Sequence, residues 1–364
     1  MYAKPVVRRL TKEEALAARP LWSEIFYEDS ERFTDYYFAE KMADNTGYGV
    51  ECGGRLCAML FLTPYTGCIA SEGGTGGRFR EIPLSYIVGV GTRRECRHRG
   101  YMDRLLRTAL ADLHAAGEPF TFLMPADPAI YTPYQFRYIY DRPDFTVCRR
   151  KEIPASVMET EEAAALADFA QRELEGRYQL FLRRDGAYYQ RQQKESRAMD
   201  GDIYLWKEQG EIAGFYLYAK ENGKEEIQEA VVRADFARRG TLEIAGAHPI
   251  IMARITNIGS MLSLMRLRAD APAETITVRL RLQDALLAAH NGTFLWTVGK
   301  KESTIAMLEA TEDAEACAEV AGLTEFLFGR KDCRACFDGA ADSGVYERLS
   351  QIAPYTRLFL NEIV

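Results

Sequence analysis

The stretch Ser85–Leu106, SYIVGVGTRRECRHRGYMDRLL, decides the fold of this chain. It begins with an apolar run typical of a buried strand and passes into a basic turn that closes on Gly100. Apolar residues then recur at helical spacing, at Met102, Leu105, Leu106, Ala109 and Leu110. A strand that leads through a turn into a helix N-terminus builds an anion site, because the first helical amides have no intrahelical acceptor. The stretch therefore predicts a site for the phosphates of a nucleotide-like ligand.

The composition of the whole chain is that of a soluble, acidic globular protein. Its 364 residues are 47% hydrophobic and 27% charged, with a formal net charge of -7. At roughly 150 residues per domain, this length predicts two or three domains. A general nucleic-acid-binding protein would be basic overall, so we expect no nucleic-acid partner.

The eight cysteines are scattered without a disulfide framework, which is typical of reduced thiols in a cytosolic protein. The first residues, MYAKPVVRRL, contain no apolar signal region, and no apolar run approaches the roughly 20 residues of a membrane span. We therefore expect a cytoplasmic protein with no membrane partner. Cys333 and Cys336 form a lone CxxC pair, which gives little support to a zinc site or a redox pair, so no metal is expected.

Residues 1–150 have the pattern of one mixed α/β unit. Thr11 and Glu14 form a capping box that predicts a helix, which Pro20 would break or kink. Further on, strand-like segments flank the glycine-rich run 71–77, which we interpret as a hairpin turn. After the opening stretch, PFTFLMPA (119–126) has the pattern of a buried strand. The unit is therefore antiparallel at first and helix-connected later.

Two further units follow. Residues 151–248 predict two helices and then three strands, with turns at Gln209-Gly210 and Asn222-Gly223. From Pro249 the run IIMARITNIGSMLSLMRL has the pattern of an amphipathic helix, and strands and helices of an α+β unit continue to the last residues, LFLNEIV. The expected domains are therefore residues 1–150, 151–248 and 249–364.

The basic turn resembles a known cofactor site. Val88-Gly89-Val90, followed by Arg97-His98-Arg99-Gly100-Tyr101-Met102, resembles the acyl-CoA site of the GNAT superfamily of N-acyltransferases, whose turn is (Gln/Arg)-x-x-Gly-x-(Gly/Ala). Arg97 and Gly100 match, whereas Met102 stands where a small residue is usual. The resemblance implies acetyl-CoA as cosubstrate, with contacts from Val88, Gly89, Val90, Arg97, His98, Arg99, Gly100, Tyr101, Met102, Ala126 and Asp127.

A second motif follows the next predicted strand. PAIYTPYQF (128–136) resembles the superfamily pattern Tyr-x-x-x-Gly-aromatic, with Tyr131 and Phe136 in place and Gln135 where glycine is usual. The resemblance implies that Tyr131 is the general acid for a departing thiolate. A phenol suits this role because its pKa of about 10 keeps it protonated at neutral pH. The alternative is a tyrosine that only packs in the core.

The chain as a whole resembles the Eis-like ("enhanced intracellular survival") family of GNAT acetyltransferases, with PIIMARITNI and FLNEIV as softer matches. The resemblance implies an N-terminal GNAT fold, a degenerate GNAT-like central domain and a C-terminal domain like sterol carrier protein. It also implies that the terminal carboxylate of Val364 is the general base, that the protein is a homo-hexamer, and that cationic small molecules are the substrates. Glu362 is expected to add negative charge that attracts such a substrate.

The expected activity is acetyl-CoA-dependent transfer of an acetyl group to a primary amine of an aminoglycoside-like or polyamine molecule, by direct attack. Two alternatives stay open. One is acetylation of a protein lysine, and the other is a catalytically degenerate GNAT that binds CoA or lipid as a sensor. The departures at Met102 and Gln135 keep the second alternative open.

Overall fold

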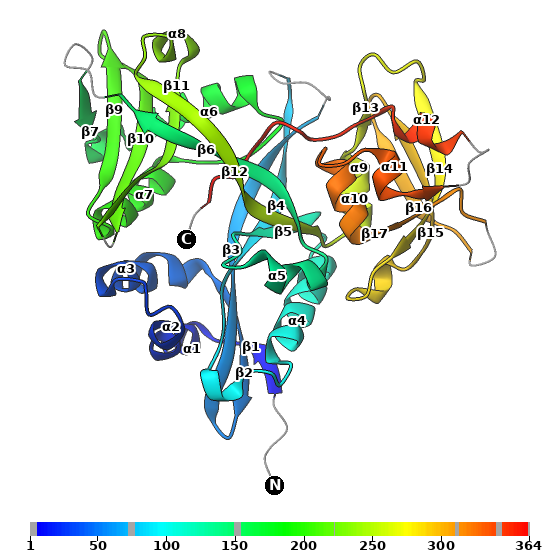
Figure 1. The fold of residues 1–364 in the computed structure, drawn as a ribbon, viewed down its shortest axis with the longest axis horizontal. Helices are drawn as coiled ribbons and strands as arrows, with labels where there is room; N and C mark the ends of the chain where they lie inside the picture. The colour runs from blue at the N-terminus through cyan, green and yellow to red at the C-terminus, as the bar shows by residue number, and fades with distance from the viewer. Residues whose placement is uncertain are drawn as a thin grey trace.

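The computed structural model describes residues 6–71, 77–148, 154–221, 223–309, 313–339 and 344–362. A long sheet runs through the middle of the molecule, with a second sheet and its helices on one side and a C-terminal sheet on the other (Figure 1). This arrangement confirms the mixed α/β class expected from the sequence. None of the described helices is long and apolar enough to cross a membrane.

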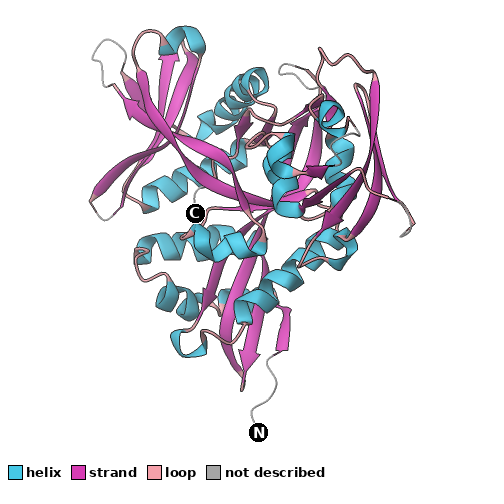
Figure 2. Ribbon diagram, turned by 45° about the vertical axis from the view of Figure 1, so that its right-hand side comes forward, coloured by secondary structure: helices cyan, strands magenta, loops and turns pink. Residues whose placement is uncertain are grey.

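The central sheet carries the candidate site. Its described strands are β1 (Val6–Arg9), β2 (Thr46–Cys52), β3 (Arg55–Ala70), β4 (Phe79–Thr92), β5 (Phe120–Leu123), β6 (Arg137–Val147), β8 (Leu180–Leu182), β12 (Leu242–Ile255) and β20 (Leu358–Phe359). They follow the order β1-β2-β3-β4-β5-β12-β6, and β8 joins the sheet beside β3 and carries β20. Figure 2 shows these long strands between the helices that cover them.

Helices cover both faces of this sheet. They are α1 (Lys12–Leu16), α2 (Arg19–Ile25), α3 (Glu31–Tyr36), a π-helical turn (Tyr37–Lys41), α4 (Tyr101–Ala115) and α5 (Pro128–Tyr131). Side chains alternate along a strand, so Phe61 of β3 packs with Trp22 of α2, whereas Leu60 packs with Leu105 of α4 on the other face. Pro20 lies in the first turn of α2, where a missing N–H costs little, so the helix predicted here is split in two.

The helix predicted to begin at Pro249 is wrong, because the first part of this segment forms the second half of strand β12. Its last residues, Ile251 to Ile255, are buried between β5 and β6, with Met252 opposite Leu123 of β5. A strand covered on both faces has the same continuous apolar pattern as a buried helix, which explains the wrong prediction. Helix α9 (Ile258–Leu264) begins only after Asn257, whose side chain caps it. Strand β12 therefore spans the domain boundary expected at residue 248.

The central region packs two long helices on an antiparallel sheet. Its elements are β7 (Ala155–Val157), α6 (Ala163–Arg177), α7 (Gly186–Ala198), β9 (Asp202–Glu208), β10 (Glu211–Glu221), β11 (Lys224–Val232) and α8 (Ala234–Ala237). The described strands follow the order β11-β10-β9-β7. Gln209 and Gly210 both have positive φ, as a primed hairpin turn requires. The two helices and three strands predicted here are confirmed, with β7 in addition.

The C-terminal region forms a separate α+β layer. Its elements are α9, β13 (Arg266–Leu267), β14 (Thr275–Gln283), β15 (Gly292–Gly299), β16 (Ser303–Met307), β17 (Ala316–Glu319), α10 (Val320–Leu327), α11 (Cys333–Cys336), β18 (Asp338–Gly339), α12 (Val345–Leu349) and β19 (Ile352–Ala353). The described sheet has the order β16-β15-β14-β17-β18 around the buried Trp296. Phe328, just after α10, stacks edge-on against Phe120 of β5 at 5.2 Å, so this layer is anchored on the central sheet.

The chain ends against the central sheet and not in the C-terminal region. Figure 1 shows the terminal segment crossing from α12 back to the middle of the molecule. There β20 pairs in parallel with β8, and the residues up to Glu362 are buried. The last described residues therefore lie at the junction between the central sheet and the central region.

Candidate active site

A gap opens in the central sheet between β4 and β5. These two parallel strands pair only at Ser85 and Tyr86 of β4, and β5 ends at Leu123. Beyond Tyr86, no described strand pairs with β4 on this side. Val90 therefore presents its backbone to a groove, and in the described structure no strand of the sheet fills it.

A β-bulge at Gly89 shapes the strand beside this gap. Met59 of β3 pairs with Gly91 and Phe61 pairs with Val88, so Gly89 and Val90 together oppose one residue. Gly89 has a φ of 60°, and a Cβ there would lie 2.4 Å from Cζ3 of Trp22. Both the positive φ and the close approach of the indole require glycine.

We expect Gly89→Ala to destabilise the protein by about 2–4 kcal/mol, because it combines left-handed strain with overpacking against Trp22. The thermal midpoint should fall, and calorimetric titration should show weaker acetyl-CoA binding as the bulge is lost. Gly54→Ala is the matched control: Gly54 also has a positive φ of 77°, but a Cβ there meets nothing within 4 Å. Equal midpoints and equal affinities for the two variants would contradict a role for the bulge.

The basic turn leads into the N-terminus of α4 as the sequence predicts. His98 and Gly100 have φ values of 60° and 72°, and Gly100 directly precedes the helix. The amide of Arg104 is bonded to the Gly100 carbonyl, so the amides before it belong to the first turn, where α-helical acceptors are missing. These amides and the helix dipole favour a bound anion.

The arginines of the turn also stabilise the turn itself. Arg97 Nε donates to the Thr92 carbonyl at 3.2 Å, and Arg99 Nη2 donates to the Glu95 carbonyl at 3.0 Å. Arg93 bonds the Leu56 carbonyl and pairs with Glu24. A hydrogen bond to a carbonyl does not neutralise a guanidinium, so Arg97 keeps a positive charge that suits a phosphate.

The groove between α2, β4 and α4 has a cavity volume of about 760 Å³. Of the residues predicted for cofactor binding, those that line it are Val90, Arg97, His98, Gly100, Tyr101, Met102 and Ala126. Those that do not line it are Val88, Gly89, Arg99 and Asp127. Asp127 instead caps α5, accepting from the Ala129 amide at 2.8 Å.

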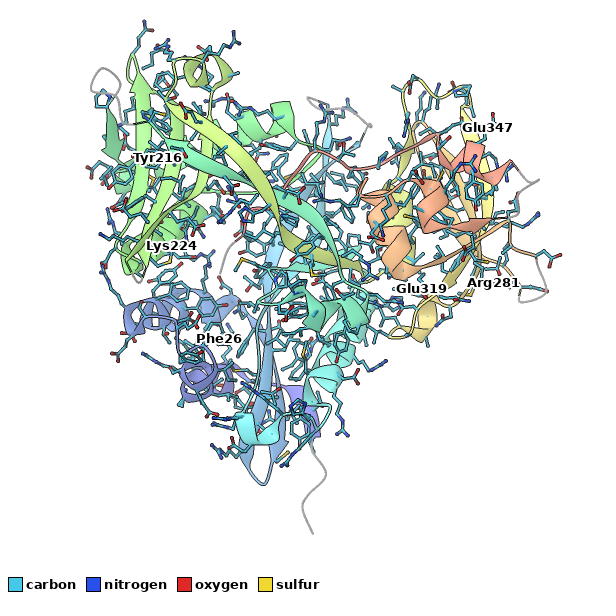
Figure 3. All side chains as sticks on the ribbon, viewed as in Figure 1. Phe26, Tyr216, Lys224, Arg281, Glu319 and Glu347 are labelled. Carbon is cyan, nitrogen blue, oxygen red and sulfur yellow. The ribbon has the colours of Figure 1, made fainter. Side chains whose placement is uncertain are left out.

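The opposite wall of the groove comes from the end of α2 and was missed by the sequence analysis. Ile25, Phe26 and Tyr27 line it together with Asp29, and Figure 3 labels Phe26 in this wall. Asp29 accepts a hydrogen bond from the Trp22 indole at 3.0 Å, and burial raises the pKa of its carboxyl. No motif marks these residues, because they reach the groove only through the packing of α2 on β4.

Tyr131 lies at the end of α5, next to the carboxyl end of β5. The side chain is buried, and its ring packs edge-on against Phe136 at 5.9 Å. Burial raises the pKa of Tyr131 to about 12. Gln135, where the family pattern has glycine, adopts the left-handed conformation with a φ of 63°. The turn therefore keeps the backbone shape that glycine would give.

The end of the chain approaches the same sheet from the other side. Glu362 is 2% exposed, and its carboxylate accepts hydrogen bonds from the Tyr65 hydroxyl at 3.0 Å, the Tyr188 hydroxyl at 2.9 Å and Arg184 Nη2 at 3.2 Å. Arg184 also pairs with Glu229. Glu362 is thus a buried carboxylate that shares the cation of Arg184 with Glu229, and not a free charge at the surface. Val364, predicted as the base, lies outside the described residues.

Tyr86 connects the two sides of the site. Its ring lies 6.5 Å from that of Tyr65, and its hydroxyl accepts from the Met124 amide at 3.2 Å. Burial raises the pKa of Tyr86, and negative charge on Glu362 or Tyr131 raises it further. Tyr86 thus contacts both Tyr65, which binds Glu362, and the backbone just after β5.

The cysteines form no second centre in the part of the chain that the structure describes. There they are all free thiols, and no group of three or more His, Cys, Asp or Glu side chains gathers as a metal site would require. Cys333 and Cys336 are buried in α11, where burial raises the pKa of both thiols.

Residues 6–139 match the family described as the acetyltransferase (GNAT) domain. The split between β4 and β5 and the turn before α4 lie inside the matched residues. This part of the chain is a GNAT acetyltransferase domain, and the protein is an acyltransferase. No curated protein sequence matches the chain.

Solved structures share this fold along the whole chain. A crystal structure of a conserved protein from Enterococcus faecalis V583, described as a probable N-acyltransferase, has a TM-score of 0.79 at 16% identity and 100% coverage of both chains. A GCN5-related N-acetyltransferase from Anabaena variabilis gives 0.75 at 14% identity, and Eis1 from Mycobacterium abscessus gives 0.71 at 14% identity. Both comparisons cover 99% of this chain and 100% of the other. These similarities establish the fold of all three regions.

Proposed function

We propose that this protein is an acetyl-CoA-dependent N-acetyltransferase that acts on a primary amine of a small molecule. The observation that carries the proposal is the gap between β4 and β5, with a groove of about 760 Å³ that ends at the N-terminus of α4. The helix amides suit the pyrophosphate, and the exposed edge of β4 suits an amide-containing arm. The apolar wall from Ile25 and Phe26 gives such an arm a surface to pack on.

In the proposed reaction, acetyl-CoA supplies the acetyl thioester. The substrate amine attacks the thioester carbonyl, and the backbone N–H near Val90 donates to the carbonyl oxygen as it gains charge. The C–N bond forms and the C–S bond breaks. Tyr131 gives its proton to the departing thiolate, and the terminal carboxylate of Val364 accepts the proton that the amine loses.

Anchoring of the tail supports this role for Val364. A carboxylate is a weak base for an ammonium with a pKa of about 10, so it needs a dry site to become more basic. The tail is buried as far as Glu362, which is held by Tyr65, Tyr188 and Arg184. Two further residues span at most about 7 Å, so this anchor limits where the carboxylate can be.

We place the amine substrate in a cavity of about 290 Å³ beside the tail anchor, which is Glu362 with the three side chains that bind it. Tyr65 and Tyr188, which bind Glu362, also line this cavity. Its charged lining residues are Lys41, Asp44, Arg183, Asp185 and Arg191. This mixed lining supports a small amine that also carries acceptor groups, such as an amino sugar, better than a simple polycation.

We further propose an Eis-like organisation of three regions, with the first boundary near residue 150 and the second within β12, which spans the boundary expected at residue 248. Support comes from the fold shared with Eis1 along the whole chain. In this proposal the central region is a degenerate GNAT-like unit, in which an antiparallel sheet is covered by α6 and α7. The C-terminal region is the sterol-carrier-like unit, and the assembly is a cytoplasmic homo-hexamer.

The test is a thiol-release assay with acetyl-CoA and a panel of amines that contains an aminoglycoside, a polyamine and a lysine peptide. We expect thiol release that depends on one class of small amine, with one acetylated product formed per thiol. Selective turnover of the lysine peptide would favour the protein-acetylating alternative. Tight binding of acetyl-CoA without turnover on any amine would make the protein a cofactor-binding sensor.

The raised pKa of Tyr131 predicts the pH dependence of turnover. Burial favours the neutral phenol and holds its pKa at about 12, so the acid stays protonated up to roughly pH 11. We therefore expect kcat to show no loss from Tyr131 ionisation between about pH 7 and pH 10.5. A basic limb near pH 9–10 that vanishes in Tyr131→Phe would mean that this phenol ionises in its ordinary range, contrary to the prediction.

A further inference from the structure

A fully buried ion pair joins the C-terminal region to the central sheet. Arg254 of β12 and Asp284, which follows β14, both have side chains with 0% exposure. Arg254 Nη2 donates to both carboxylate oxygens of Asp284, at 2.7 and 2.5 Å. Burying two charges costs desolvation free energy, so such a pair adds little net stability to the fold. We therefore ask which neighbouring groups the pair holds in place.

The other arm of Arg254 holds the turn that follows Tyr131. Its Nη1 donates to the Tyr134 carbonyl at 2.9 Å and to Gln135 Oε1 at 3.0 Å. Gln135 occupies the position of the family glycine and keeps the left-handed backbone conformation. Its side chain thus supplies an acceptor that glycine lacks, and this gives a physical reason for the departure.

Asp284 is itself fixed by a loop of the C-terminal region. It accepts from the amides of Leu286 and Leu287 at 2.7 and 3.1 Å, and it lies 2.8 Å from His290 Nδ1. Burial alone would raise the pKa of the Asp284 carboxyl. The hydrogen bond from His290 and the charge of Arg254 outweigh burial and hold this pKa well below its usual range. The carboxylate therefore stays ionised and keeps Arg254 oriented.

The same loop contacts both halves of the acyl-transfer site. Arg107 of α4 donates to the Ala285 carbonyl at 3.1 Å, so the loop touches the helix that begins at the phosphate site. Leu287 packs in the same buried cluster as Tyr131 and Phe136. A change in this loop would therefore reach the general acid through Arg254 as well as through the core.

We propose that Arg254, held by Asp284, is a positioning residue that fixes Tyr131 through the Tyr134–Gln135 turn. The C-terminal region thereby completes the acetyltransferase site from outside the acetyltransferase domain. The inference rests on the proposed function for its kinetic consequence. The placement of the Tyr131 ring, however, can be measured without any turnover.

Gln135→Gly tests this inference with little risk to folding. Glycine adopts the same positive φ at low cost, so the variant removes the bond from Arg254 to the Gln135 side chain and leaves the bond to the Tyr134 carbonyl. We expect kcat to fall about tenfold while KM for acetyl-CoA stays the same, because misplacement of a catalytic group lowers the chemical step. Gln135→Glu, which keeps an acceptor for Arg254, should restore kcat to within about twofold.

Asp141→Asn is the matched control. Asp141 of β6 receives both Nη atoms of Arg330, at 2.7 and 3.1 Å, and so also links the C-terminal region to the central sheet. This pair is partly exposed, and no hydrogen bond joins it to the turn after Tyr131 in the described structure. We expect kcat to be unchanged in this variant. An equal loss of kcat in both variants would mean that general attachment of the region matters and would overturn the proposal.

A second readout separates this inference from the proposed function. 3-Fluorotyrosine placed at position 131 reports the ring environment by ¹⁹F NMR, even if no amine is acetylated. We expect its resonance to move in Gln135→Gly and in the charge-removing double variant Arg254→Met with Asp284→Asn, but not in Asp141→Asn. An unmoved resonance in both test variants would overturn the inference, whereas a moved resonance in a protein without turnover would overturn only the proposed activity.

Discussion

Replacing Tyr131 with phenylalanine will lower kcat by roughly 10²- to 10⁴-fold and leave the KM for acetyl-CoA nearly unchanged. The size follows from the usual contribution of a positioned general acid. The phenol makes no hydrogen bond that holds the fold among the described residues, and its ring would still pack on Phe136. Steady-state kinetics with the best amine of the panel gives the measurement.

Tyr138→Phe is the control for this substitution. Tyr138 is a half-buried tyrosine of β6, packed against the same cluster as Tyr131, and it does not line the groove. It should keep full kcat. If Tyr131→Phe retained kcat within about threefold of the parent, another group would be the acid, and Tyr131 would be a core residue.

Replacing Arg184 with methionine will destabilise the protein by about 3–5 kcal/mol, because two buried carboxylates lose their shared cation. Arg184 and its partners Glu229 and Glu362 each have side chains with 2% exposure. The loss should appear as a lower midpoint of urea unfolding. We also expect turnover to fall as the terminal carboxylate loses its anchor.

The neighbouring residue provides a matched control for stability. Arg183 pairs with Glu81, but both side chains are more than half exposed, so Arg183→Met should cost no more than about 1 kcal/mol. Conversely, deletion of Ile363 and Val364 leaves the anchor intact and should abolish turnover with little change in the midpoint. A truncated protein that kept full turnover would exclude the terminal carboxylate as base.

The parts of the site that depend on local sequence could be predicted. The strand, basic turn and helix of Ser85–Leu106 lie where the sequence places them, because apolar periodicity and the positive φ of Gly100 act within a few residues. The same holds for the hairpin at Gln209-Gly210 in the central region.

The parts that depend on distant contacts could not be predicted. Strand β12 is inserted between β5 and β6, although its apolar run fits a helix equally well. Arg184 and Glu362 are separated by 178 residues, and no local pattern pairs them. Glu362 therefore looked like a free charge near the end of the chain, whereas folding buries it. The wall at Ile25–Asp29 was missed for the same reason.

Gln135 illustrates how a departure from a family pattern can be misread. From the sequence it kept open the alternative of a catalytically degenerate protein, because glycine is usual there. In the structure the backbone keeps a φ of 63°, and the side chain accepts a hydrogen bond from Arg254. The departure is thus compensated by a contact with a strand more than a hundred residues away.

The most direct test of the central claim is a crystal structure of the protein with bound acetyl-CoA. We predict the pyrophosphate against the backbone amides of residues 98–102, the pantetheine arm along β4 near Val90, and the thioester between Tyr131 and the terminal carboxylate. Acetyl-CoA bound away from the β4–α4 groove, or in the groove with its thioester beyond the reach of Tyr131, would contradict the account.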